Sequence, residues 1–456
     1  MKKVALSALA AAMMSGAVYA ETLTLYTDAK TGQVFTTAGE GRVEMGDFVD
    51  AKTVDMAQRE SESSFSEYKD AMKKYVNVKS KAKTIEFSGT HYFGLTSNSY
   101  SERNYDGGDK STGFELRRNY LQAKAYFNDK DYFRVTMDTT KELQSSTTNA
   151  NMYAKYAYLY LDKVLPYTGV EIGIAHRPWI DYEEHNSWYF RSINKVILED
   201  KFSSIETKAG DKATDFGPDV LNSADLGFNL KTKTPYFSSE LGMFNGEGYH
   251  ADKAANNQQN SSDLSFEWRL TGHLLGNGDK KMKFSKDTYA NISFAGISSK
   301  NHKDDNDLVD DASEYDRNAY WFHFVYNQPE FLIAAQYDAV ENKNQTTGDT
   351  TKLKMYSVNG EIRPMQDWTI LARYDNLKTE YSNNATSNAN DVGDGNQFIY
   401  GVAYDYNKNV KFIASGKTVN AKDKTAATGA YTGATATTVG DMLDKQSYML
   451  TTEVNW

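Results

Sequence analysis

Residues 445–456 read K-Q-S-Y-M-L-T-T-E-V-N-W, and this stretch alternates in hydropathy from end to end. On an extended strand, successive side chains point to opposite faces. One face is mostly apolar and ends in an aromatic; it carries Tyr448, Leu450, Thr452, Val454 and Trp456. The other face is mostly polar and carries Ser447, Met449, Thr451, Glu453 and Asn455. The pattern predicts a β-strand that lies between an apolar and a polar environment.

The same period of two recurs along the chain from about residue 84. It predicts sixteen strands, over residues 84–99, 113–128, 131–143, 151–163, 169–180, 223–231, 234–245, 264–275, 287–300, 316–328, 330–342, 353–364, 367–381, 396–406, 409–420 and 445–456. A closed antiparallel barrel of the bacterial outer-membrane type requires an even number of strands. We therefore predict an all-β fold, a 16-stranded antiparallel transmembrane β-barrel over residues 84–456.

The connections between these strands form two alternating sets. One set is tight and comprises residues 128–131, 231–234, 327–330, 364–367 and 406–409. The other set is long and polar and comprises residues 181–222, 246–263, 301–315, 343–352, 382–395 and 421–444. Short turns at one end and long loops at the other are typical of outer-membrane barrels. Aromatic residues gather beside the tight turns, as an interfacial girdle would require: Phe127, Tyr132, Phe133, Tyr236, Phe237, Tyr326, Phe331, Trp368, Tyr404 and Tyr406.

Residues 1–20 have the features of a secretory signal peptide. Lys2 and Lys3 precede a short apolar stretch, and Val18-Tyr19-Ala20 places small residues at a cleavage site. Cleavage would leave a chain that begins at Glu21 and would change the net charge from −10 to −12. No later stretch has about 18 consecutive apolar residues, so no transmembrane helix is predicted.

Residues 21–80 are expected to form a short periplasmic segment ahead of the barrel. Residues 21–50 have the pattern of a small β-unit, in which strands at 23–27 and 33–37 flank a turn. Residues 51–80 are expected to be helical. This helix would act either as a spacer or as a short coiled coil between subunits, and its apolar stripe is Phe65, Tyr68, Met72 and Tyr75.

Composition and motifs exclude several classes of function. The chain has no cysteine, which rules out disulfides and zinc–thiolate sites. It has no nucleophile elbow, metalloprotease, P-loop or dinucleotide-binding motif, so we predict no enzyme activity, cofactor or metal site. The net charge of −10 argues against nucleic acid as a partner. The acidic run at 304–311 lacks the glycine of a calcium-binding loop and indicates a solvated loop, which divalent cations could bridge to lipopolysaccharide.

Charged residues within the predicted strands fall on the polar face. A charged side chain that faced lipid would cost about 2–4 kcal/mol near the bilayer midplane, so we expect these residues to face a water-filled lumen. The predicted pore-lining residues are Lys124, Arg134, Asp138, Glu171, Arg177, Glu267, Arg269, Glu361, Arg363, Arg373, Asp375, Lys411 and Lys417. They would either order water and tune the pore or pair with one another and brace the wall.

The connection after the fifth strand, residues 181–222, is a second candidate site. Its apolar segments Trp188-Tyr189-Phe190 and Val196-Ile197-Leu198 should fold against another part of the protein. It would either enter the barrel or cap it from outside. Its charged residues are Asp181, Glu183, Glu184, Arg191, Lys195, Glu199, Asp200 and Lys201.

This arrangement resembles bacterial outer-membrane porins, and most of all the phosphate-selective porin O/P family. The local similarity lies in Gly173-Ile174-Ala175-His176-Arg177-Pro178-Trp179 and in Arg117-Arg118-Asn119-Tyr120-Leu121. In sixteen-stranded porins the loop after the fifth strand forms a constriction inside the barrel, so the resemblance implies the same for residues 181–222. Phosphate-selective members line the pore with a ladder of arginines and lysines. Here acids match the inward-facing basic residues almost one for one, which argues against phosphate selectivity.

The resemblance implies a porin in the bacterial outer membrane. Small hydrophilic solutes and ions would diffuse passively through the barrel, since sixteen strands can enclose an aqueous channel. The implied partners are outer-membrane lipid and lipopolysaccharide, the barrel-assembly machinery and two further copies in a homotrimer. The main alternative is a non-conducting barrel with a surface, adhesion or structural role, which a plugged lumen would favour. An outer-membrane hydrolase and a sheath around an electron-transfer protein are more distant alternatives.

Overall fold

The computed structural model describes residues 23–48, 81–100, 110–139, 152–207, 214–246, 248–249, 263–303, 314–383, 388–391, 394–422, 425–427, 439–442 and 444–456. The chain divides into two compact units, residues 1–81 and 82–456. The expected signal peptide at 1–20 and the expected helix at 51–80 lie outside the described residues. None of the helices in the described part of the chain is long and apolar enough to span a membrane.

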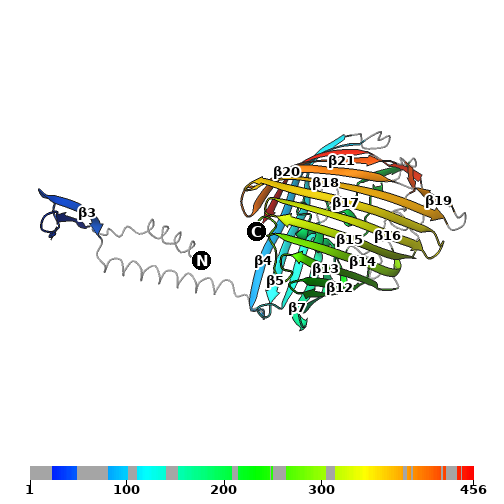
Figure 1. Cartoon of the computed structure of the whole chain (residues 1–456), viewed down its shortest axis with the longest axis horizontal. Helices are drawn as coiled ribbons and strands as arrows, with labels where there is room; N and C mark the ends of the chain where they lie inside the picture. The colour runs from blue at the N-terminus through cyan, green and yellow to red at the C-terminus, as the bar shows by residue number, and fades with distance from the viewer. Residues whose placement is uncertain are drawn as a thin grey trace. The chain divides into compact units, whose positions relative to one another are not determined.

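The first unit contains a small antiparallel sheet, drawn in blue in Figure 1. Its strands are β1 (Leu23–Asp28), β2 (Val34–Phe35) and β3 (Arg42–Phe48), in the order β2-β1-β3. The Asp28 carboxylate accepts the backbone N–H groups of Lys30 and Thr31, each at 2.8 Å, and so turns the chain from β1 into β2. Sequence analysis predicted strands at the positions of β1 and β2 but not β3.

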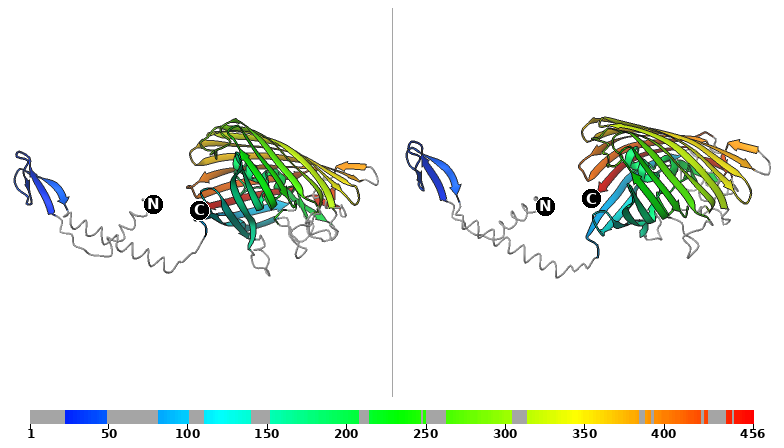
Figure 2. Two further views of the ribbon diagram at one scale, coloured as in Figure 1. Left: turned by 90° about the horizontal axis from the view of Figure 1, so that it is seen from below. Right: turned by 60° about the horizontal axis from the view of Figure 1, so that its bottom comes forward.

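The second unit is a closed antiparallel barrel of sixteen long strands (Figures 1 and 2). Strands that follow one another in this set pair with one another, and β24 pairs with β4 to close the barrel, with Leu450 opposite Leu95. The short strand β19 (Asn388–Asp391) extends one hairpin by pairing with β18. The predicted barrel is therefore confirmed. Its strands are β4 (Thr84–Tyr100), β5 (Lys110–Tyr126), β6 (Tyr132–Thr139), β7 (Met152–Leu165), β8 (Thr168–His176), β11 (Ala224–Lys233), β12 (Phe237–Phe244), β13 (Ser265–Leu275), β14 (Tyr289–Lys303), β15 (Glu314–Gln328), β16 (Phe331–Asn344), β17 (Thr350–Met365), β18 (Trp368–Asn383), β20 (Gly395–Asp405), β21 (Val410–Ala421) and β24 (Lys445–Asn455).

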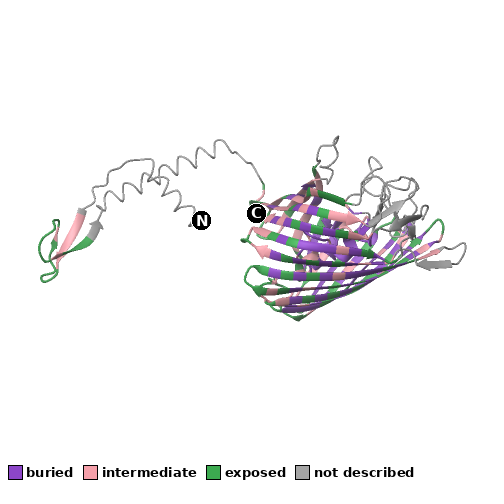
Figure 3. Ribbon diagram, turned by 90° about the horizontal axis from the view of Figure 1, so that it is seen from above, coloured by how far each residue is buried: buried purple, intermediate pink, exposed green. Residues whose placement is uncertain are grey.

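The barrel wall has an exposed, mostly apolar outer face and a buried inner face. On β24, the outward-facing Tyr448 and Leu450 are 58% and 61% exposed, whereas the inward-facing Ser447 and Thr451 are 4% and 2% exposed. Figure 3 shows this alternation as bands of buried and exposed residues along the strands. Because the sheet is closed, it has no edge whose backbone groups would lack partners in lipid.

Many strand ends differ from the predicted bounds by one to four residues, and at two of them a proline explains the difference. The strand expected at 169–180 ends at His176, because Pro178 cannot donate a hydrogen bond to the ladder. The strand after the next tight turn begins at Phe237, two residues beyond Pro235.

At the end of the barrel with long loops, a four-stranded antiparallel sheet joins two of these loops. Its order is β10-β9-β23-β22. β9 (Ser203–Thr207) and β10 (Thr214–Phe216) belong to the loop after β8. β22 (Thr425–Ala427) and β23 (Val439–Met442) belong to the loop between β21 and β24. β9 and β23 make the link between the two loops, and Glu206 stands opposite Asp441.

The outward face of β15 supplies a test of the lipid-facing assignment. Phe322 is 51% exposed in the middle of this strand. We predict that Phe322→Arg lowers the free energy of unfolding by about 2–4 kcal/mol, because the charge would face hydrocarbon. Urea unfolding of the barrel in lipid vesicles measures this, with Phe322→Leu as the apolar control. Equal stability of the two variants would contradict the assignment.

Candidate functional site: a loop inside the barrel

The loop after β8 folds into the barrel. It contains the helix α3 (Ile180–Asn186) and the 3-10 helix η2 (Ile197–Glu199). Its apolar side chains are buried and form one cluster with inward-facing apolar residues of β14 to β24. The loop members of this cluster are Trp179, Ile180, Tyr182, Trp188, Phe190, Ile193, Val196, Ile197, Leu198, Phe202, Val220 and Leu221. The loop therefore packs on one side of the interior as a hydrophobic core would.

Polar side chains of the same wall hold the loop backbone. The Asn359 side chain on β17 donates to the Ser187 carbonyl at 2.9 Å. On β18, the Arg373 guanidinium donates to the Lys195 carbonyl at 2.6 Å. Each bond satisfies a loop carbonyl that has no ladder partner, so the wall side chains complete the hydrogen bonding of the inserted segment.

Most of the predicted pore-lining charges stand as ion pairs, which lie at the start of the loop and on strands between β12 and β21. Their pairing neutralises charges that would otherwise be buried alone, a situation that is strongly destabilising. The nitrogen–oxygen distances are 2.5 Å for Arg177–Glu267, 2.8 Å for Arg269–Glu240, 3.0 Å for Arg363–Glu361, 2.7 Å for Arg373–Asp375, 3.6 Å for Lys411–Asp405 and 3.7 Å for Lys417–Asp200.

The remaining predicted pore-lining residues lie on β5, β6 and β8. Glu171 accepts from Lys231 and from His176, each at 2.9 Å. Asp138 accepts the backbone N–H of Asn119 at 3.0 Å. The Lys124 ammonium lies 5.1 Å from the centre of the Tyr132 ring, and the Arg134 guanidinium lies 4.7 Å from that of Tyr156.

The predicted charges of the loop make their own network. The Arg191 guanidinium pairs with Glu184 and with Glu199, the latter at 2.5 Å. Burial alone would raise the pKa of the Glu199 carboxyl, but Arg191 and Lys195 hold this pKa well below its usual range. At the far end of the loop, Asp200 accepts from Asn194 at 2.7 Å, and Lys201 pairs with Asp219 at 3.4 Å.

A cavity of about 290 Å³ remains between the loop and strands β4 to β8. Its wall side includes Tyr92, Arg118, Tyr120, Gln122, Arg134, Tyr156 and His176. Its loop side includes Asp181, Glu184, His185, Trp188, Tyr189 and Arg191. Of the predicted site residues, Arg134, Asp181, Glu184 and Arg191 thus meet around one cavity.

Sequence reasoning missed three basic residues of this wall, which lie at two β-bulges. On β5, Arg117 has no partner in the register: Leu116 pairs with Phe93, and Arg118 pairs with Tyr92. Arg117 and Arg118 therefore both point into the barrel. The signal in the sequence is a change of parity, since the outward-facing apolar positions are even at Phe114 and Leu116 and odd from Leu121.

Lys155 on β7 is the third missed residue. In the register with β6, Tyr156 pairs with Thr136 and Ala154 pairs with Met137, so Lys155 is the extra residue of a bulge. It is 3% exposed, and its ammonium lies 5.2 Å from the centre of the Tyr120 ring.

Arg118, Arg134 and Lys155 differ from the cations on the opposite wall. In the part of the chain that the structure describes, none of the three makes an ion pair with a carboxylate. Each lies over tyrosine rings instead, as Arg118 does over Tyr120 at 4.3 Å. The wall beside the cavity therefore carries positive charge from Arg118 and Arg134, both of which line it, and no paired acid cancels this charge.

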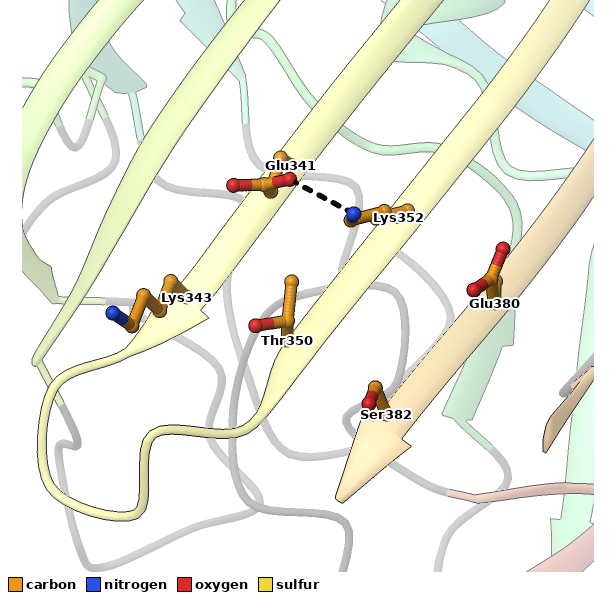
Figure 4. Close-up of a pocket in the computed structure, with 6 residues that line it drawn as sticks. All are labelled: Glu341, Lys343, Thr350, Lys352, Glu380 and Ser382. Atoms are coloured by element: carbon orange, nitrogen blue, oxygen red, sulfur yellow. Dashed lines mark ion pairs between the residues drawn. The ribbon is translucent and has the colours of Figure 1, made fainter. Parts of the chain in front are cut away.

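A second hollow, of about 320 Å³, lies on the outer face of β16 to β18 near the long-loop end (Figure 4). It is polar, and the Lys352 ammonium pairs with Glu341 at 3.3 Å. The other lining residues are Lys343, Thr350, Glu380 and Ser382. These outward-facing charges stand beyond the apolar band of the barrel.

Comparison with solved structures shows the same fold at low sequence identity. The outer-membrane expressed OmpT of Vibrio cholerae has a TM-score of 0.52 and 14% identity, over 83% of this chain and 99% of that chain. The anion-selective porin from Comamonas acidovorans has a TM-score of 0.52 and 12% identity, over 82% of this chain and 99% of that chain. A trimer form of the Vibrio protein has a TM-score of 0.50 and 13% identity, with coverage of 82% and 99%.

No protein-family model and no curated protein matches the chain. The comparisons with solved structures therefore establish the sixteen-stranded barrel fold. They do not extend to the solute or to the subunit number.

The ion pair between Arg177 and Glu267 gives one prediction. Both side chains are almost fully buried, at 2% and 3% exposure. Glu267→Gln should lower the free energy of unfolding by about 3–5 kcal/mol, because it leaves a buried guanidinium without its counter-ion. The double variant Arg177→Met, Glu267→Leu should recover most of this loss in urea unfolding. A double variant as unstable as the single one would contradict the pairing.

Glu183 gives a pH-dependent prediction. Burial raises its pKa to about 7, against the opposing effects of Arg373 and of the Trp179 indole N–H, which donates to it at 2.7 Å. The folded loop holds this proton more tightly than the unfolded chain. Stability is therefore complete below the unfolded pKa of 4.5 and falls as pH rises through about 7.

Glu183→Gln keeps a hydrogen-bond acceptor and removes the titration. We expect the loss of stability between pH 5 and pH 8 to be smaller in this variant than in the wild-type chain, by on the order of 3 kcal/mol. Urea unfolding followed by tryptophan fluorescence at both pH values measures it. The same loss in both proteins would show that another group titrates.

Proposed function

We propose that this protein is an outer-membrane porin through which small hydrophilic solutes and ions diffuse passively. One observation carries the proposal: a cavity with charged and tyrosine side chains lies between the inserted loop and the β4–β8 wall of a closed sixteen-stranded barrel. A barrel of this size can enclose water, and polar groups along the cavity offer hydrogen bonds to a hydrated solute. Transport would be downhill and would need no cofactor or enzymatic step.

In this proposal the loop narrows the pore and directs solutes along one wall. Its apolar cluster on β14 to β24 occupies part of the lumen, and its charged face turns towards β4 to β8. The ion pairs behind the loop would brace it. The pore-tuning role would then belong to the cavity wall, with Arg118 added to the predicted Arg134.

We further propose a preference for anions. Arg118 and Arg134 line the cavity and supply positive charge there, and their partners are aromatic rings rather than acids. The same fold carries anion selectivity in the Comamonas acidovorans porin. The proposal does not extend to phosphate, because Arg177, Arg269 and Arg373 pair with acids and do not form a basic ladder.

The proposed setting is the bacterial outer membrane, reached with a signal peptide at 1–20 and the barrel-assembly machinery. Residues 21–80 and the tight turns would then lie in the periplasm. The lysines that line the hollow in Figure 4 support contact with lipopolysaccharide phosphates in this proposal. A homotrimer is the proposed assembly. Its support is a polar pair on the outer surface, His91 and Asn119, whose side chains approach to 2.6 Å and which protein would accommodate better than lipid.

The alternative is a non-conducting barrel with a surface or structural role. The hydrophobic cluster of the loop inside the lumen favours it, because that packing fills space that a wide pore would leave open.

A salt gradient across a planar bilayer tests both proposals on the refolded mature protein. Discrete current steps with an anion-leaning reversal potential are expected. Arg118→Ala should lower the anion-to-cation permeability ratio about twofold, because a positive charge leaves the pore wall. Lys352→Ala on the outer surface is the matched control. A folded barrel without current steps would exclude the porin, and a cation-leaning reversal potential would exclude the anion preference.

A further inference from the structure

The connection between β13 and β14 stands apart from the other turns at its end of the barrel. It spans residues 276–288 and is longer than the tight turns in the described part of the chain. Met282 and Phe284 are half-buried, whereas the lysines around them are exposed. The proposed channel gives this turn no role.

Phe284 reaches from this turn to the inserted loop. Its ring stacks on that of Tyr189, with ring centres 4.3 Å apart and an angle of 29° between the planes. Met282 and Tyr189 also pack on the same buried group, which is Tyr289, Val325, Leu332 and Ala334. The turn from one end of the barrel therefore meets the loop from the other.

The barrel wall holds the turn in place. The Asn327 side chain on β15 donates to the carbonyls of Phe284 and Asp287, at 2.9 and 2.7 Å. The Arg363 guanidinium on β17 lies 5.0 Å from the centre of the Phe284 ring. Asn327 and Arg363 thus hold Phe284 from two strands of the wall.

Hydrogen bonds connect the loop to the first residue after the turn. The hydroxyl oxygens of Tyr189 and Tyr289 lie 2.7 Å apart. The Tyr289 hydroxyl donates to the carbonyl of Asn186, the last residue of α3, at 2.7 Å. Tyr289 therefore joins the end of the helix, the aromatic contact and the start of β14.

We propose that the stack of Phe284 on Tyr189 positions the loop and so sets the width of the pore. Tyr189 is itself part of the cavity lining, so a shift of its ring changes the cavity directly. Phe284 acts through Tyr189 and is a positioning residue. The inference rests on the proposed porin function, and its test is designed to separate the two.

Three variants of the full mature chain make the test. Phe284→Ala removes the stacked ring, and Phe284→Tyr retains a ring. Phe127→Ala is the matched control, because Phe127 is an exposed aromatic beside a different turn. Transient closures in single-channel recordings report the loop position. Trypsin cleavage after Arg191 and Lys195 of the folded barrel reports it without any need for conductance.

Phe284→Ala should raise both the closure frequency and the cleavage rate roughly two- to tenfold, the range that one aromatic stack supports. Phe284→Tyr and Phe127→Ala should match the wild type. If Phe284→Ala matches the wild type in both readouts, the positioning role is overturned even though the porin stands. If the wild type never conducts, the porin fails, and the cleavage ratio still decides whether Phe284 positions the loop.

Discussion

The barrel depends on the backbone hydrogen bonds between strands whose outer face is apolar. Where lipid replaces water, an unpaired N–H or C=O group finds no other partner, so a sheet must close. Here β24 meets β4 along almost its whole length, and each long strand lies between two neighbours. Closure in turn creates an interior, which here holds the inserted loop and the cavity beside it.

The interior has two different halves. Against β14 to β24, the loop buries tryptophans, leucines and isoleucines on inward-facing apolar residues, and buried ion pairs surround this contact. Against β4 to β8, tyrosines and unpaired cations face a cavity. The loop separates these halves, because one of its faces is apolar and the other is charged. Its sequence thus decides which part of the wall meets water.

The sequence predicted the strands well, because a period of two persists in every strand that faces lipid on one side. Alternation failed at Arg117 and Lys155, each of which is the inserted residue of a β-bulge. Periodicity also could not say which acid each cation meets: Arg177 and Glu267 are ninety positions apart, and only the closed register brings them together. Entry of the loop into the barrel was implied by the resemblance, whereas its apolar segments indicated only that it folds against another part of the protein. The sequence did not indicate which strands the loop packs against, and only the structure shows that they are β14 to β24.

The four-stranded sheet of the long loops bears on the order of folding. β9, in the loop after the fifth barrel strand, pairs with β23, just before the last one. Such non-local pairs form late, since the intervening chain must first be organised. The outer arm of the loop therefore waits for the C-terminal hairpin before it gains its strand partner. In a nascent barrel, the sheet that joins the two long loops would stay incomplete until the final strand is in place. The barrel wall and this sheet at its entrance would therefore be completed together.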